Sequence, residues 1–183
     1  MATQQAVRDG LEYIWIDTCC INKASSAELS ESINSMFKWY RDAAICYAYL
    51  DDVQLLDHGP GPVPFFDEYG ELAREYIAEE ILATARWFTR GWTLQELLAP
   101  EKVRFYVTGW KFIGDKRYLE PTLSRITGVQ TAAFDVGISL NSFTVATRMR
   151  WASSRETTRP KDMAYCLLGL FDVNMPLLYS EGG

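Results

Sequence analysis

The order of predicted elements in the first fifty residues constrains the fold most strongly. Residues 4–8 end a helix ahead of Gly10. Residues 13–17 form a short apolar run rich in strand-forming side chains, which is typical of a buried parallel strand. A Ser-x-x-Glu capping box then begins a helix over residues 25–42, and residues 43–50 predict a second strand. This alternation indicates an α/β fold with a mostly parallel sheet.

The rest of the chain predicts one further strand and a helix-rich C-terminal half. The strand is expected at residues 103–107, which are apolar and β-branched or aromatic at most positions. Helices are expected over residues 68–88, 116–127, 141–151 and 159–170.

Composition limits the class of protein. A chain of 183 residues with 48% hydrophobic content can bury one core, so we expect a single domain over residues 1–183. The net charge of −6 argues against nucleic acid as a partner. The sequence has neither a membrane-length apolar run nor a signal peptide, which predicts a cytoplasmic protein without a membrane span. Both ends are abrupt, which predicts a domain truncated at both ends and lacking its first strand.

The cysteines and the single histidine argue against several chemistries. No cysteine has a zinc-site spacing, so no metal site is predicted. Cys46 and Cys166 lie in apolar runs and are expected to be buried. The adjacent Cys19 and Cys20 are expected to pack rather than to bridge. His58 lies in a Gly/Pro-rich stretch, so a Ser-His or Cys-His nucleophile is not expected.

Residues 87–100 hold the most unusual run of the chain. Trp87 and Trp92 lie just ahead of a short predicted helix with one acidic residue, Glu96. Thr93 and Glu96 have the spacing of a capping box, and a proline ends the helix. The two indoles either stack on a base or ring, or pack in the core against the sheet.

Several segments resemble the fungal heterokaryon incompatibility (HET) domain. The likeness covers nearly the whole chain and rests on residues 16–22, 37–43, 87–100, 148–152 and 158–169. The resemblance implies a role in fungal nonself recognition, in which such domains trigger cell death after incompatible hyphae fuse. The family's opening strand with a Ser-His-x-Trp type motif has no match here, and Ser180 replaces the glycine of its Leu-Tyr-Gly-Glu motif.

Residues 92–97 also look like the Trp-Cys-Leu-x-Glu-Leu segment of plant TIR domains, whose glutamate is catalytic in NAD cleavage. The resemblance implies a flavodoxin/TIR-like sheet from which a middle strand is missing. It makes Glu96 the candidate catalytic carboxylate, which would stabilise an oxocarbenium-like centre on the ribose. NAD would be the substrate, and no further cofactor is required. The alternative role for Glu96 is to close the capping box with Thr93.

Five residues are candidates for binding a nucleotide: Asp17, Arg86, Trp87, Arg90 and Trp92. The arginines either hold a diphosphate or form surface ion pairs. Asp17 ends the predicted strand, where ligand sites of α/β sheets gather, or it caps a turn. The basic residues of 148–161 either dock a phosphate or a partner, or form a solvated helix face.

Three functions remain open from the sequence. The domain is a cell-death effector that cleaves NAD, or a non-catalytic module that self-associates or binds a protein partner through its aromatic surface. The third alternative is a truncated, inactive fragment.

Overall fold

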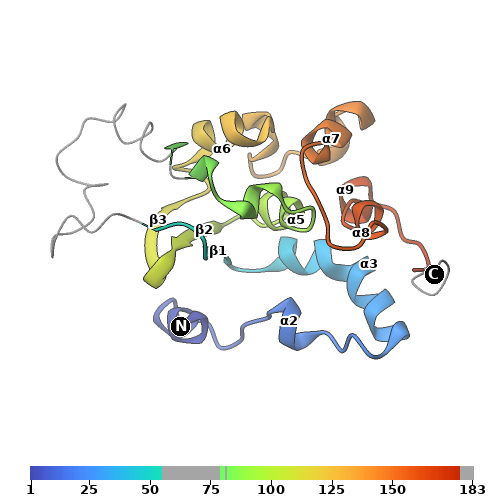
Figure 1. Ribbon diagram of the computed structural model, residues 1–183, viewed down its shortest axis with the longest axis horizontal. Coiled ribbons are helices and arrows are strands. Elements are labelled where there is room, and N and C mark those ends of the chain that lie inside the picture. Colours follow the sequence, from blue (N-terminus) through green and yellow to red (C-terminus); the bar gives the residue numbers. More distant parts are fainter. Residues whose placement is uncertain (55–78, 81, 178–183) are drawn as a thin grey trace, which may run out of the picture.

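A three-stranded mixed sheet lies toward one end of the computed structural model, which describes residues 1–54, 79–80 and 82–177 (Figure 1). Strand β1 (Cys46–Leu50) pairs in parallel with β2 (Val103–Val107). Strand β3 (Lys111–Asp115) pairs antiparallel with the other edge of β2. The α/β class is therefore confirmed, whereas the mostly parallel flavodoxin/TIR-like sheet is not.

Most of the helices are short, and α7, α8 and α9 lie at the end away from the sheet (Figure 1). The α-helices are α1 (Ala2–Arg8), α2 (Asp17–Cys20), α3 (Ser26–Asp42), α5 (Thr93–Leu98), α6 (Glu120–Thr127), α7 (Val145–Ala152), α8 (Asp162–Tyr165) and α9 (Leu168–Phe171). The 3-10 helices are η1 (Arg86–Thr89), η2 (Thr108–Trp110), η3 (Thr131–Ala133) and η4 (Leu140–Ser142). Within the described ranges, no helix is long and apolar enough to cross a membrane.

The predicted strand at residues 13–17 is wrong. Residues 11–16 form a loop that leads into α2, and Asp17 is the first residue of that helix. Ile16 keeps the extended backbone of a strand, with φ −137° and ψ 120°. Because no described residue forms a ladder with this segment, its strand-like sequence does not become a strand.

Strand β3 was not predicted from the sequence. Its residues 111–115 include two charged side chains and Gly114, which weaken a strand prediction. Gly114 has φ +149°, and a Cβ there would lie 3.0 Å from the Leu119 side chain. The ladder register also shifts between Phe105 and Tyr106, so β3 follows an irregular edge that only glycine fits.

Other predicted elements are confirmed with shifted bounds. The helix expected over 25–42 is α3, and the Ser25 hydroxyl accepts the Glu28 N–H at 3.3 Å. The helix expected over 116–127 is shorter at its start and ends at Gly128, whose φ is +68°. Of the helix expected over 68–88, most residues lie outside the described ranges.

The C-terminal half is helical as expected, but in shorter pieces. The helix predicted over 141–151 is η4 followed by α7, and the helix predicted over 159–170 is divided into α8 and α9. Asp172, with φ +55°, ends α9 in the left-handed conformation.

The core lies on one face of the sheet. Ala48, Leu50, Val103, Phe105 and Val107 are fully buried there, and α5 and α6 lie on that side, whereas α1 lies on the other (Figure 1). A second cluster of buried side chains joins α3 to the C-terminal helices: Ile33, Met36, Tyr165 and Leu168.

The close packing of α9 on α3 makes Gly169→Ala destabilising. A Cβ on Gly169 would lie 2.8 Å from Cδ2 of Phe37 and nearer still to the Cβ and Cγ atoms of the same side chain. Because both helices must move apart, we expect a loss of about 1 to 3 kcal/mol in the free energy of unfolding. Urea unfolding measures this loss, with Ser154→Ala at an exposed loop position as the control. Equal urea midpoints for Gly169→Ala and Ser154→Ala would contradict the close packing of α9 on α3.

Candidate functional site

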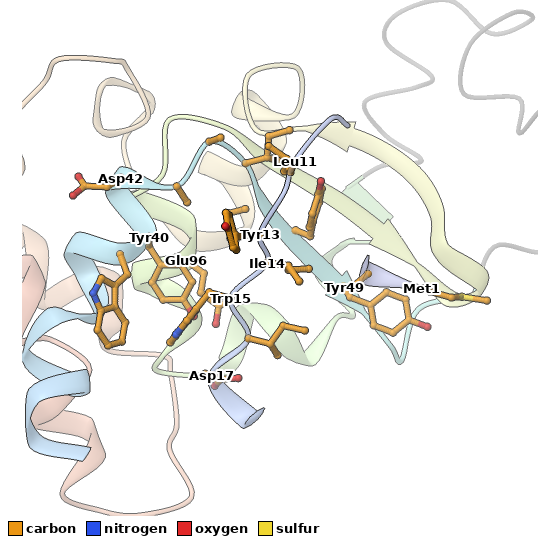
Figure 2. A pocket seen from close by; sticks show the side chains of 18 of the residues that line it. Met1, Leu11, Tyr13, Ile14, Trp15, Asp17, Tyr40, Asp42, Tyr49 and Glu96 are labelled. Carbon is orange, nitrogen blue, oxygen red and sulfur yellow. The ribbon is translucent and has the colours of Figure 1, made fainter. Parts of the chain in front are cut away.

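A cavity of about 1010 Å³ lies between the N-terminal segment and the free edge of β1 (Figure 2). Its walls come from α1, from residues 11–17, from the end of α3 and from β1, and Glu96 of α5 also lines it. Most of the lining is apolar or aromatic. Tyr40, Trp15, Glu96 and Asp17 gather at one end, and Met1 and Tyr49 lie at the other (Figure 2).

The helix that carries Glu96 does not use it as a cap. The N-cap residue of α5 is Trp92, and no side chain caps that end. The Thr93 hydroxyl donates instead to the carbonyl oxygens of Trp87 and Arg90, the latter at 2.9 Å. The predicted capping box is therefore absent, and the Glu96 side chain lines the cavity.

Two donors hold the Glu96 carboxyl group. The Trp87 indole and the Tyr40 hydroxyl both hydrogen-bond to it. Burial, followed by the negative charge of Asp17, raises the pKa of Glu96 to about 7, although the two hydrogen bonds and the charge of Arg90 oppose this rise. Near neutral pH the group therefore exists in both the protonated and the ionised form, as is typical of a general acid or base whose pKa lies near the working pH.

A segment far along the chain supports the loop ahead of α5. The Arg155 guanidinium is buried and donates to the Arg90 carbonyl and to the Thr93 hydroxyl, both at 2.9 Å. The Gly91 N–H donates to the Glu156 carbonyl at 2.8 Å. A Cβ on Gly91 would lie 2.6 Å from Cγ2 of Thr157, so only glycine allows this approach. Nothing in the spacing along the sequence indicates this contact.

The structure brings four of the six predicted site residues together. Asp17 and Glu96 line the cavity. Trp87 is only 7% exposed, and its ring packs 5.6 Å from that of Phe105, so it acts through its indole N–H rather than by stacking on a ligand. Arg90 is exposed and near enough to lower the pKa of Glu96.

The other two candidates, like Trp87 and Arg90, lie outside the cavity lining, and each has a partner elsewhere. Arg86 forms surface ion pairs with Asp52 at 3.1 Å and with Asp51 at 3.4 Å. The half-buried Trp92 donates its indole N–H to Asp162 at 3.4 Å. These contacts favour structural roles for both residues, and their binding to a nucleotide stays a prediction.

Two aromatic residues of the site were not among the candidates. The rings of Trp15 and Tyr40 meet edge to face at a centroid distance of 5.7 Å, and Trp39 lies 5.3 Å from Trp15. The spacing of α3 had placed Tyr40 only on a packed helix face. A signal existed for Trp15, since it lies two residues before the candidate Asp17 in an otherwise apolar run.

The basic segment at residues 148–161 is not simply a solvated helix face. Arg148 is buried, donates to the Leu170 carbonyl at 2.6 Å and to Asn141 at 2.9 Å, and lies over the Phe171 ring. With Arg155 also buried, two of the five basic side chains hold the fold together.

The cysteines divide into a buried and an exposed pair. Cys46 and Cys166 are buried as predicted, and burial raises the pKa of the Cys166 thiol to about 11. Cys19 and Cys20 are exposed, so the expectation that they pack is wrong. They lie on the four-residue helix α2, which has no buried residue. Among the described residues, no group of side chains has the makings of a metal site.

The raised pKa of Glu96 predicts how stability depends on pH. Between about pH 4.5 and 7 the folded chain holds more protons than the unfolded chain, so the free energy of unfolding falls as the pH rises through this window and levels off above it. The total contribution to the free energy of unfolding is on the order of 3 kcal/mol. Urea unfolding of the wild type and of Glu96→Gln across this range isolates the effect, because glutamine does not titrate. If the difference in free energy of unfolding between the two proteins stayed constant with pH, the raised pKa of Glu96 would be contradicted.

Comparison with known proteins identifies the family. The sequence profile described as "Heterokaryon incompatibility protein (HET)" matches residues 1–96, which is more than half of the chain. The vegetative incompatibility protein HET-E-1 of Podospora anserina is 47% identical over 178 residues. The match covers 97% of this chain but 12% of HET-E-1, so the chain spans a small part of that relative's length. No solved structure matches. The resemblance noted in the sequence is confirmed, and the chain belongs to the heterokaryon incompatibility (HET) family.

Proposed function

We propose that this HET domain acts in fungal nonself recognition by cleaving NAD, with Glu96 as the catalytic carboxylate. The observation that supports the proposal best is the environment of Glu96. Its carboxyl group lines an aromatic cavity, has a pKa raised to about 7, and is held by Trp87 and Tyr40 instead of by the helix cap.

The chemistry needs few protein groups. The bond between the ribose C1′ and the nicotinamide nitrogen breaks, and its electron pair leaves with nicotinamide. Positive charge then develops at C1′, where the Glu96 carboxylate would stabilise it. A water oxygen forms the new bond to C1′ and loses a proton, which gives ADP-ribose. Tyr40 would stay neutral throughout, because burial and the nearby Glu96 raise its pKa above the ordinary value.

The aromatic lining suits the ligand. Trp15 has an edge-to-face contact with Tyr40 beside Glu96, and both residues line the cavity. Such rings offer flat apolar surfaces to a nicotinamide or adenine ring. The volume of about 1010 Å³ is at the upper end of the range for small-molecule pockets, which suits a dinucleotide.

Incubating the purified chain with NAD and measuring free nicotinamide tests the proposal. Because the ionised carboxylate is the active form, we expect the rate to rise about tenfold per pH unit below about pH 7 and to level off above it. A chain that is folded by its unfolding transition but releases no nicotinamide would contradict catalysis.

A second function, assembly through an aromatic surface, is favoured by the exposed face of the sheet. Tyr49 and Phe112 are 42% and 39% exposed, and the half-buried Trp110 lies 4.9 Å from the Tyr49 ring. Sedimentation of the wild type and of Phe112→Ser separates this function from catalysis. If the domain assembles through this face, the variant should sediment as a smaller species than the wild type.

A further inference from the structure

Helix α2 presents two thiol groups to solvent. Cys19 and Cys20 are both exposed, whereas Cys46 and Cys166, the other two cysteines of the chain, are buried. Helix α2 contributes no buried residue to the core and lies at the outer side of the fold (Figure 1). Because packing does not shield these two thiols, they are open to reagents in solution.

The two thiols contact each other as well as the chain. A hydrogen bond joins their side chains. Both sulfurs also bond to the backbone of Ile16, since Cys20 Sγ accepts the Ile16 N–H at 3.4 Å and the Cys19 thiol donates to the Ile16 carbonyl at 3.6 Å. Partial loss of solvent around its sulfur, followed by the Cys20 thiol, raises the pKa of Cys19. Cys19 therefore keeps its proton, and Cys20 is the sulfur better placed to attack.

The residue that holds both sulfurs also belongs to a wall of the Glu96 cavity. Ile16 and Asp17 line that cavity, whereas neither Cys19 nor Cys20 does. The Ile16 carbonyl accepts the amide N–H groups of Cys19 and Cys20 at 3.2 and 2.8 Å, and these bonds hold α2 in its helical turn. A chemical change at the two sulfurs therefore acts on the backbone that forms the cavity wall.

We propose that Cys19 and Cys20 form a thiol-exchange site for low-molecular-weight disulfides, at which the pair closes to a vicinal disulfide and unwinds α2. The Cys20 thiolate attacks one sulfur of the small disulfide, forms a mixed disulfide and expels the first small thiolate. Cys19 then loses its proton and attacks Cys20 Sγ, and the second small thiolate leaves. The chain loses two protons and two electrons, and the small disulfide is reduced to two thiols.

The bridge would be easy to reverse. Adjacent Cα atoms lie about 3.8 Å apart, whereas the Cα atoms of bridged cysteines usually lie about 4.4 to 6.8 Å apart. A bridge between neighbours is therefore strained and readily reduced. Closure also removes the S–H group that donates to the Ile16 carbonyl and twists the peptide between the cysteines out of helical geometry, so Ile16 and Asp17 must move. This inference uses no step of NAD cleavage.

Oxidised glutathione tests the pair directly. The chain is incubated with an excess of it and quenched in acid, and the remaining thiols are alkylated under denaturing conditions before mass spectrometry. We expect one disulfide per chain, between Cys19 and Cys20, with the two buried cysteines still reduced and with full reversal in reduced glutathione. In NMR spectra, the amides of Ile16 and Asp17 should shift when the bridge closes and return when it is reduced.

Two single variants separate the steps, and both should fold because α2 has no buried residue. Cys19→Ser removes the second thiol and should stop at a mixed disulfide, with one glutathione on Cys20. Cys20→Ser removes the attacking thiol, so its Cys19 should react about tenfold or more slowly.

Three results would overturn the proposal. In the first, the wild type stays reduced, or a buried cysteine is oxidised instead. In the second, Cys19 and Cys20 each carry a glutathione without bridging. In the third, the pair bridges but the amides of Ile16 and Asp17 keep their positions. Because NAD is absent from these samples, none of these results bears on the assignment of Glu96.

Discussion

Replacing Glu96 with glutamine is expected to lower kcat for nicotinamide release by about 10² to 10³, with little change in KM. Glutamine keeps the shape of the side chain and can still accept from Trp87 and Tyr40, so substrate binding and folding should persist. What it removes is the negative charge beside C1′, which contributes only as positive charge develops in the transition state. Steady-state assays of nicotinamide release at pH 8, where the wild-type carboxyl group is ionised, measure the loss.

The control for this variant is Glu101→Gln. Glu101 is exposed, lies just after α5 and does not line the cavity, so its substitution should leave kcat unchanged. An equal loss of activity in both variants would mean that general charge, rather than the position of Glu96, sets the rate.

The second large effect is expected at the centre of the sheet, where Phe105→Ala should lower the free energy of unfolding by about 3 to 5 kcal/mol. Phe105 lies on β2, has no exposed surface, and contacts Trp87 and Phe88 at centroid distances of 5.6 and 6.2 Å. Removing its ring leaves a cavity directly behind the indole that holds Glu96. Domains have only about 5 to 15 kcal/mol of stability in total, so this variant should be partly unfolded at 37 °C.

Phe112→Ala is the matched control, since it removes the same ring from the neighbouring strand β3. Phe112 is 39% exposed and contacts Tyr106 only at 5.5 Å among the described rings, so the loss should stay below about 1 kcal/mol. Urea unfolding compares the two variants. A similar loss at both positions would show that β2 is not the centre of the core.

Local sequence signals predicted those elements that local interactions stabilise. The capping serine at the start of α3 and the glycine that ends α6 set their helix ends almost alone. The strand at residues 13–17 and the missed strand at 111–115 depend on partners instead. The first has strand-forming residues without a described neighbour, and the second has weak residues that pair with β2.

The residues of the site also fall into those that the sequence predicted and those that depend on distant partners. The sequence singled out Glu96 and Asp17, and both line the cavity. The sequence also predicted a capping box that would have occupied Glu96. The Thr93 hydroxyl bonds elsewhere, because the carbonyl oxygens of Trp87 in η1 and of Arg90 just after it face this hydroxyl. Arg155 lies 62 residues after Thr93 and 65 residues after Arg90 along the chain. No local sequence pattern could therefore reveal its hydrogen bonds to them.

The most direct test of the central claim, that the Glu96 cavity binds the nucleotide, is an NMR titration of the Glu96→Gln variant with NAD. This variant should bind NAD without consuming it. The account predicts shifts in the Trp15 indole N–H and in the amides of Asp17 and Tyr40, with no shift at Met149 on the exposed side of α7. If saturating NAD left the cavity resonances in place, or moved only residues outside it, the account of this site would be wrong.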